Sequence, residues 1–297
     1  MAVELQGIYP AVITPMTTDG VFMPEAFEAL CGRLYQDGVD GLYVCGQTGE
    51  GLSMSLEQRK AVAERAVEAT PTGRQVIVHV GASSTAAAMD LARHAARVGA
   101  HALSSLPPAG SYSMDEVYGY YEALAGATDL PFLVYYYPGH AAHPRTYDEL
   151  MRLCEIPNVA GLKFTSTDLY LLRRLKDNAV TVFSGFDEIL AAGLLMGADG
   201  GIGSFYNVAA RWFVELYQAA RRGDWERARV LQSKVNGLVT IGLRYQPHAA
   251  VKEILRWQGL DCGVCAAPRR RLTPAEVEQL QAELNEGATA SLRPVCI

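Results

Sequence analysis

The chain has 297 residues, of which 49% are hydrophobic and 20% are charged, and its formal net charge is −6. A mildly acidic chain without a block of basic residues is a poor candidate for binding nucleic acid. No apolar run approaches the ~18 residues that a membrane-spanning helix needs, and no secretory signal is visible, so we expect a cytoplasmic protein that does not enter the membrane.

Six cysteines are scattered along the chain, a usage typical of a reducing compartment rather than of a disulfide framework. The Cys-x-x-Cys motif at 262–265 has no second ligand pair, and the His-x-x-His motif at 140–143 has no acidic residue at a useful spacing. Both are weak signals for a metal. We therefore expect neither a metal nor a bound cofactor.

Short strand-like runs alternate with helical segments along most of the chain. The predicted strands lie at 7–15, 41–46, 75–81, 102–108, 131–137, 159–165, 180–185 and 200–204. The predicted helices between them lie at 24–37, 55–69, 84–98, 114–127, 146–154, 167–177 and 187–196. Beyond residue 206 the pattern predicts helices alone, at 207–222, 224–243, 247–258 and 274–287.

This succession of strand–helix units predicts a (β/α)₈ TIM barrel. A doubly wound open sheet is the alternative, but no Gly-x-Gly-x-x-Gly motif follows the first strand. We expect residues 1–206 to supply the barrel strands and most of the helices. Residues 207–297 should supply the last barrel helix and a C-terminal helical extension of the same domain.

Lys163 lies in the sixth predicted strand among residues that read as buried. One interpretation is an edge strand whose lysine reaches water, since most lysines are solvated. In a TIM barrel, however, chemistry takes place at the carboxyl ends of the strands, and alternation points Lys163 inward with Gly161 and Thr165. Burial lowers the pKa of a lysine and makes its amine a nucleophile that can form an imine with a carbonyl substrate.

Polar residues stand at three other predicted strand ends. Thr48, in a glycine-rich turn, can help to hold a carboxylate, although an ordinary strand-to-helix turn is the alternative. One of the tyrosines at 135–137 must face the barrel interior, either as a proton shuttle or as a core residue with a satisfied hydroxyl. Asp187 and Glu188 can accept hydrogen bonds from a polyhydroxylated ligand, or can cap a helix.

Four motifs occur in order at these strand ends: Gly-x-Thr-Gly-Glu at 46–50, Tyr-x-x-Pro at 135–138, Gly-Leu-Lys at 161–163 and Gly-Ile-Gly-Ser at 201–204. With them the chain resembles the N-acetylneuraminate lyase and dihydrodipicolinate synthase family of pyruvate-dependent class I aldolases, from about residue 5 to beyond 260. Within the family it looks most like the lyases. The resemblance implies an imine in place of a cofactor, a small 2-oxo acid as substrate, and a homotetramer.

The resemblance also implies residue roles. Lys163 would form the imine with pyruvate, and Tyr135 would be the catalytic tyrosine, because its spacing to Pro138 fits the motif. The implied substrate-binding residues are Gln47, Thr48 and Gly49 at the carboxylate, Thr165 near the reacting carbons, and Gly185, Asp187, Glu188, Gly203 and Ser204 at the hydroxyl-rich tail of a sugar.

Three positions separate this chain from patterns in that family. Gln47 stands where a serine or threonine is usual, and an amide cannot relay a proton as a hydroxyl does. Gly110 stands where a tyrosine usually reaches into a neighbouring subunit. His140 occupies the place of a synthase arginine that pairs with the carboxylate of aspartate semialdehyde, and a neutral histidine lacks the guanidinium fork.

The sequence therefore predicts a Schiff-base lyase that cleaves N-acetylneuraminate to N-acetylmannosamine and pyruvate. One alternative is another pyruvate-dependent aldolase, synthase or dehydratase acting on a 2-keto-3-deoxy sugar acid. The other is a non-catalytic 2-oxo-acid-binding protein on the same scaffold.

Overall fold

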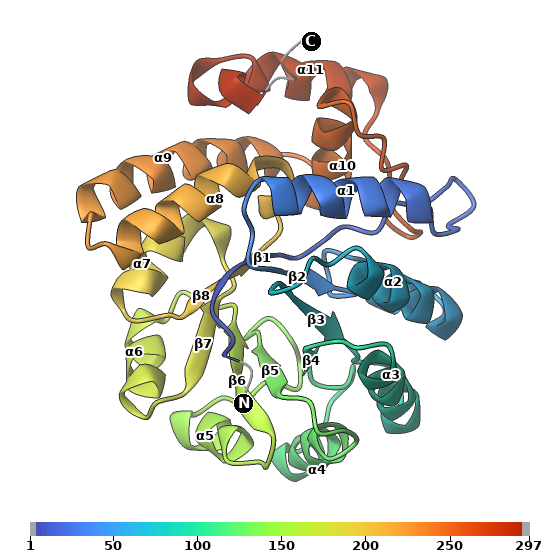
Figure 1. The fold of residues 1–297 in the computed structure, drawn as a ribbon, viewed down its shortest axis with the longest axis vertical. Helices are drawn as coiled ribbons and strands as arrows, with labels where there is room; N and C mark the ends of the chain where they lie inside the picture. Colours follow the sequence, from blue (N-terminus) through green and yellow to red (C-terminus); the bar gives the residue numbers. More distant parts are fainter. Residues whose placement is uncertain (1–3, 293–297) are drawn as a thin grey trace.

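The computed structural model of the chain describes residues 4–292, and eight parallel strands form its centre (Figure 1). The strands are β1 (Gly7–Pro10), β2 (Gly41–Val44), β3 (Gln75–His79), β4 (Ala102–Ser105), β5 (Phe132–Tyr136), β6 (Val159–Phe164), β7 (Thr181–Ser184) and β8 (Gly200–Gly203). They pair in the order β1-β8-β7-β6-β5-β4-β3-β2. A parallel bridge between Ala11 and Tyr43 joins the two ends of this order, so the predicted barrel is confirmed and the open sheet is wrong.

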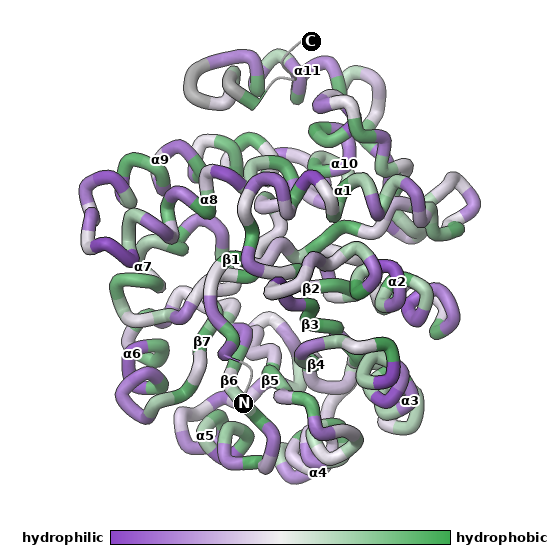
Figure 2. Tube along the Cα trace, viewed as in Figure 1, coloured by the Kyte–Doolittle hydropathy of each residue, from purple (hydrophilic) through white to green (hydrophobic). Residues whose placement is uncertain are grey.

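A ring of helices surrounds the strands (Figure 1). The ring consists of α1 (Pro24–Gln36), α2 (Leu56–Glu68), α3 (Thr85–Arg97), α4 (Met114–Ala125), α5 (Tyr147–Cys154), α6 (Leu169–Asp177), α7 (Leu190–Leu195) and α8 (Tyr206–Arg221). Two short 3₁₀ helices, η1 (Gly51–Ser53) and η2 (Asp187–Ile189), precede α2 and α7. Helix α3 buries Ala88, Leu91, Ala92 and Ala95, the spacing of one helix face. Figure 2 shows such alternation of hydrophobic and hydrophilic residues around the ring.

Capping side chains fix where several of these helices begin. Ser55, Ser84 and Ser113 each accept a hydrogen bond from the backbone N–H three residues later, at the start of α2, α3 and α4. Thr146 and Asp168 do the same for α5 and α6. A side-chain oxygen at this position satisfies an N–H that has no partner within the helix. The predicted helix starts are therefore set by local chemistry.

The C-terminal part of the described chain is helical, with α9 (Trp225–Gly242), α10 (Pro247–Trp257), α11 (Pro274–Leu284) and the 3₁₀ helix η3 (Gly287–Leu292). Helix α9 packs against α8 and η2, and α10 packs against α8. Figure 1 shows α11 at the end of the molecule away from α4 and α5. The assignment of residues 207–297 to the same domain as the barrel stays a prediction; this packing supports it up to residue 292, and 293–297 lie outside the described residues.

Two buried clusters hold the barrel together. The larger lies between the strands and the helices. The smaller fills the barrel interior and contains Leu5, Tyr9, Ala11, Tyr43, Ile77, Ala102, Leu133, Phe183 and Ile202. These residues alternate with outward-facing ones along each strand, as the pleat requires. Apolar side chains therefore fill the barrel interior up to the carboxyl ends of the strands, where the polar residues lie.

Several strands end earlier than predicted. The structure ends β1 at Pro10 and β4 at Ser105, whereas the sequence predicts strands to 15 and 108. Pro15, Pro107 and Pro108 lie in these missing stretches, and proline has no N–H to donate to the next strand. After β1, single contacts with the neighbouring strands continue: Ala11 bridges to Tyr43, and the backbone N–H of Val12 donates to the carbonyl of Tyr43 at 2.9 Å.

Candidate active site

Lys163 and Tyr135 lie side by side at the carboxyl end of the barrel. They are register partners on β6 and β5, and Phe183 on β7 is the next partner of Lys163. The Lys163 side chain is buried, with its Nζ 4.0 Å from the centre of the Tyr135 ring and 4.4 Å from that of Tyr43. The interpretation of an edge strand with a solvated lysine is wrong, because β6 pairs on both sides and buries this side chain.

Burial lowers the pKa of Lys163 from 10.5 to about 7, and the negative charge of Asp187 acts in the opposite direction. The apolar interior disfavours the charged ammonium, and this is the larger effect. Cation–π contacts with two tyrosine rings offset part of that cost. A substantial fraction of the lysine is therefore a free amine at neutral pH, which is the form that attacks a carbonyl carbon.

The hydroxyl of Tyr135 donates a hydrogen bond to Oε1 of Gln47 at 3.3 Å. Burial raises the pKa of Tyr135 to about 12, although the Thr165 hydroxyl acts in the opposite direction. The phenol is thus protonated at neutral pH. Tyr136 points away and stacks on Phe164 with ring centres 5.1 Å apart, so Tyr135 is the interior tyrosine of this strand end.

Asp187 is buried at the end of β7, with 5% of its surface exposed. Its Oδ2 accepts a hydrogen bond from the backbone N–H of Phe205 at 2.7 Å, so it caps the start of α8 rather than its own helix. Burial raises the pKa of Asp187 to about 7, and the charge of Glu188 adds to this. A side chain at Gly203 would lie 1.9 Å from Oδ1 of Asp187, which explains the glycine there.

The turn at 46–51 follows β2 and faces the same opening. The Thr48 hydroxyl lies 2.6 Å from that of Ser204, so this turn and the end of β8 are linked directly. The carbonyl of Gly49 accepts a hydrogen bond from the Thr14 hydroxyl at 2.7 Å, and a Cβ at Gly49 would lie 2.8 Å from the carbonyl oxygen of Val12. Gly49 therefore permits close packing behind the turn.

A cavity of about 320 Å³ joins these groups. Its walls include these predicted site residues: Gln47, Thr48, Tyr135, Lys163, Thr165, Gly185, Asp187, Glu188 and Ser204. Gly49 and Gly203 do not line it and act instead as spacers behind it. Tyr137, one of the three tyrosines considered above, also lines it. The remaining walls come from residues that the sequence analysis did not single out: Phe186, Ile202, Phe205, Val239, Leu243, Pro247 and His248. The apolar ones follow ordinary core periodicity, so no local signal marks them.

Two of the positions that depart from the family pattern lie off this cavity. Gly110 is exposed in the loop after β4. His140 lines a separate cavity with Arg59 and His79. Gln47, in contrast, lies on the wall beside Tyr135. Among residues 4–292, no group of three or more His, Cys, Asp or Glu side chains could hold a metal ion, and no helix is long and apolar enough to cross a membrane.

Comparisons with known proteins agree with the fold described above. The chain is 34% identical over 281 residues to an N-acetylneuraminate lyase of Rhizobium meliloti, with 94% of each chain covered. The crystal structure of an N-acetylneuraminate lyase from Mycoplasma synoviae superposes with a TM-score of 0.87 at 31% identity, covering 94% of this chain and 97% of that one. A dihydrodipicolinate synthase from Aquifex aeolicus has a TM-score of 0.91 at 25% identity, covering 98% and 100%.

The lyases among these relatives confirm the expected enzyme class, a carbon–carbon lyase. Residues 4–287 match the dihydrodipicolinate synthetase family over nearly the whole chain. The chain therefore belongs to the dihydrodipicolinate synthetase family.

Proposed function

We propose that the protein cleaves N-acetylneuraminate, or a close sugar acid, to pyruvate and an aldehyde sugar through an imine on Lys163. The observation that carries this proposal is the buried amine, whose pKa is lowered to about 7, beside the protonated phenol of Tyr135. The lyase relatives at 33–34% identity support the choice of substrate. The proposal needs no cofactor other than the imine itself.

In this reaction Nζ of Lys163 attacks the 2-oxo carbon, and water leaves as the imine forms. The protonated imine withdraws electrons, so the C3–C4 bond breaks and its electron pair forms an enamine. The proton of the C4 hydroxyl must leave at the same time. Because Tyr135 is already protonated, its phenol accepts that proton only while passing its own to the carboxylate of the substrate. Protonation of the enamine and hydrolysis of the imine then release pyruvate.

The walls of the cavity suit a sugar acid. Thr48 offers a hydroxyl for the carboxylate, while Ser204, Asp187 and Glu188 offer hydrogen-bonding groups for sugar hydroxyls. A second anionic carboxylate, as in aspartate semialdehyde, would meet these two acidic side chains and be repelled. This arrangement favours cleavage of a polyhydroxylated substrate over the synthase reaction.

A second candidate is cleavage of a shorter 2-keto-3-deoxy sugar acid. The observation that favours it is the Gln47 side chain, which is hydrogen-bonded to Tyr135 and occupies part of the cavity wall. A non-catalytic role in binding 2-oxo acids is the weakest of the three hypotheses, because binding alone does not need the buried amine. We also retain the proposals of a cytoplasmic location, based on the cysteine usage, and of a homotetramer, based on the resemblance.

The test is a borohydride reduction in the presence of pyruvate, followed by mass mapping of the modified peptide. We expect an adduct on Lys163, and none in the Lys163→Ala variant. An adduct on another lysine, or none, would overturn the aldolase proposal. Values of kcat/KM for N-acetylneuraminate, 2-keto-3-deoxygluconate and the synthase reaction then decide the substrate, and a preference for the semialdehyde would contradict the choice made above.

A further inference from the structure

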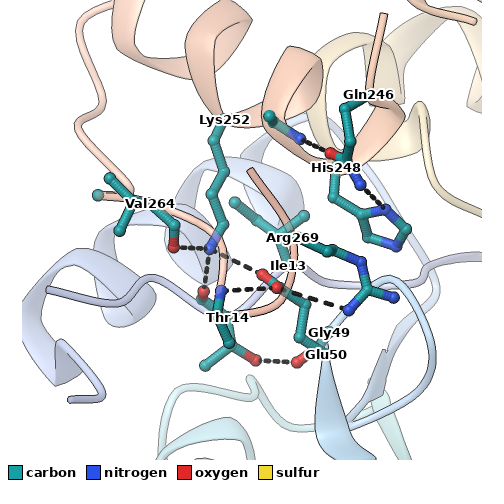
Figure 3. Close-up of polar contacts among 12 residues, drawn as sticks. Ile13, Thr14, Gly49, Glu50, Gln246, His248, Lys252, Val264 and Arg269 are labelled. Atoms are coloured by element: carbon teal, nitrogen blue, oxygen red, sulfur yellow. Dashed lines mark hydrogen bonds and ion pairs between the residues drawn. The ribbon is translucent and has the colours of Figure 1, made fainter. Parts of the chain in front are cut away.

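A fully buried ion pair joins helix α10 to the turn at 46–51 (Figure 3). Nζ of Lys252 lies 3.0 Å from Oε1 of Glu50, and the two side chains are 1% and 0% exposed. The same ammonium donates hydrogen bonds to the carbonyl of Thr14, at 2.8 Å, and to that of Val264. The ammonium thus contacts three separate parts of the chain, Thr14 and Val264 through hydrogen bonds and Glu50 through the ion pair.

Glu50 is held equally firmly on its other side. Its Oε2 accepts a hydrogen bond from the backbone N–H of Ala266 at 2.8 Å and lies 3.8 Å from the guanidinium of Arg269 (Figure 3). The backbone of Glu50 has a φ of 55°, in the left-handed region that non-glycine residues seldom adopt. The C-terminal part of the chain therefore fixes a strained residue that is the last of the Gly-x-Thr-Gly-Glu motif.

Helix α10 makes a second contact with the turn, one helical turn earlier. Nε2 of His248 donates to the carbonyl of Gln47 at 3.2 Å. Nδ1 accepts a hydrogen bond from the side chain of Gln246 at 3.3 Å (Figure 3). This pattern requires a neutral ring, in agreement with burial lowering the pKa of His248. Residues four apart share a helix face, so His248 and Lys252 hold the turn on both sides of Thr48.

A buried ion pair contributes little net free energy to folding, because well-packed apolar residues in the same place stabilise a fold as much or more. What this pair does is fix a backbone position. Gln47 accepts the hydrogen bond of Tyr135, and Thr48 lies 2.6 Å from Ser204 in the cavity wall. The position of the turn thereby determines where a carboxylate sits relative to the amine of Lys163.

We propose that Lys252 and Glu50, assisted by His248, are positioning residues that hold the carboxylate-binding turn against Lys163. This inference rests on the proposed function, since it assumes a 2-oxo acid whose carboxylate binds at the turn. The C-terminal extension then belongs to the catalytic unit, although it supplies no reacting group. Misplacing a bound group by about 1 Å can cost on the order of 10²-fold in rate, so the effect is measurable.

The test compares borohydride trapping of pyruvate with that of acetone, a ketone that has no carboxylate. In Lys252→Met and Glu50→Gln we expect half-saturation by pyruvate to require roughly 10- to 100-fold more ligand, with acetone trapping unchanged. Lys252→Arg should recover part of the loss. The matched control is Lys176→Met, which breaks a distant ion pair with Asp199 (Nζ to Oδ2, 2.6 Å) and should alter neither reaction.

Equal losses for pyruvate and acetone, or no loss for either, would overturn the positioning role. If Lys252→Met does not fold, His248→Phe removes both hydrogen bonds of a half-buried ring, including the one to Gln47 in the turn, and must show the same selective loss. Failure of the proposed function is seen separately, in the unmodified protein. If that protein binds pyruvate but forms no adduct, the proposed function is wrong, and the positioning role is tested by calorimetric dissociation constants for pyruvate instead. If it does not bind pyruvate, both proposals are wrong.

Discussion

Replacing Lys163 by methionine is expected to abolish turnover and to stabilise the fold. The unmodified protein holds this lysine in an environment that lowers its pKa from 10.5 to about 7. At ~1.4 kcal/mol for each tenfold change, that fall corresponds to about 5 kcal/mol of unfavourable free energy when the group is protonated. Methionine has a similar length and no charge to desolvate, so most of this cost disappears.

The net gain is smaller, because the variant also loses the cation–π contacts with Tyr43 and Tyr135. Replacing a buried ion pair by apolar side chains of similar volume is often neutral or stabilising by about 1–4 kcal/mol, and we expect a gain within this range for the single charge of Lys163. At roughly 2–4 °C for each kcal/mol, the melting temperature of Lys163→Met should rise by several degrees at about pH 6.5.

The way in which the stability difference between the two proteins changes with pH tests the reasoning more sharply than the size of the difference at one pH. Because the pKa of Lys163 is lower in the folded chain, the unfolded chain binds more protons between about pH 7 and 10.5, and the unmodified protein gains stability as the pH rises. The advantage of Lys163→Met is therefore largest below pH 7 and disappears toward 10.5. Asp187 acts in the same direction. Without the positive charge of Lys163, its buried carboxylate is harder to ionise, so the variant loses stability as the pH rises.

The assay is differential scanning calorimetry of both proteins from about pH 6 to about pH 10, without pyruvate. Lys176→Met is the control, because it removes a lysine whose side chain is paired with Asp199 and 16% exposed. That variant should lose stability, since it leaves a carboxylate without its partner. A Lys163→Met variant that melts below the unmodified protein at pH 6.5, or whose advantage grows with pH, would refute the reasoning from desolvation.

Three further predictions concern the site. Tyr135→Phe should still form the imine but slow carbon–carbon cleavage by roughly 10²–10⁴ in single-turnover assays, whereas Tyr136→Phe, the control, should have little effect. Gly203→Ala should raise the KM for the sugar acid by roughly 10- to 100-fold, because its Cβ would lie 1.9 Å from Asp187 Oδ1; Gly119→Ala, with open space around its Cβ, should not. The rate of adduct formation with pyruvate should rise with pH through about 7, since only the free amine of the catalytic lysine attacks, and a flat profile would contradict the lowered pKa.

The barrel, and the placement of Lys163 and Tyr135 side by side in its interior, could be predicted from the sequence because their signals are local. A strand, a cap and a helix recur with a regular period, and alternation within one strand decides that Lys163 faces inward. Among three adjacent tyrosines, the choice of Tyr135 came from the resemblance to the family, whose Tyr-x-x-Pro motif fits its spacing to Pro138. Strand ends were less predictable, because departure from the sheet depends on what the emerging loop contacts.

The residues that the sequence analysis missed depend on tertiary placement. Val239 and Leu243 repeat at the spacing of a buried helix face, and nothing in that spacing separates a cavity wall from a core. Lys252 reads as an ordinary helical lysine, although it is fully buried against Glu50, about two hundred residues earlier. Asp187 was weighed as a cap for its own helix, but its carboxylate caps α8, whose start lies beside it only in the folded barrel.

The pKa values of Lys163 and Asp187 are both shifted mainly by burial. The same desolvation lowers the pKa of Lys163 and raises that of Asp187, and each is near 7 in the folded protein. At neutral pH the two groups can therefore be both charged or both neutral at similar free energy. In the proposed reaction the neutral state supplies the free amine. Once the imine forms and is protonated, its positive charge favours the ionised form of Asp187, which then stabilises the electron-withdrawing iminium while the carbon–carbon bond breaks.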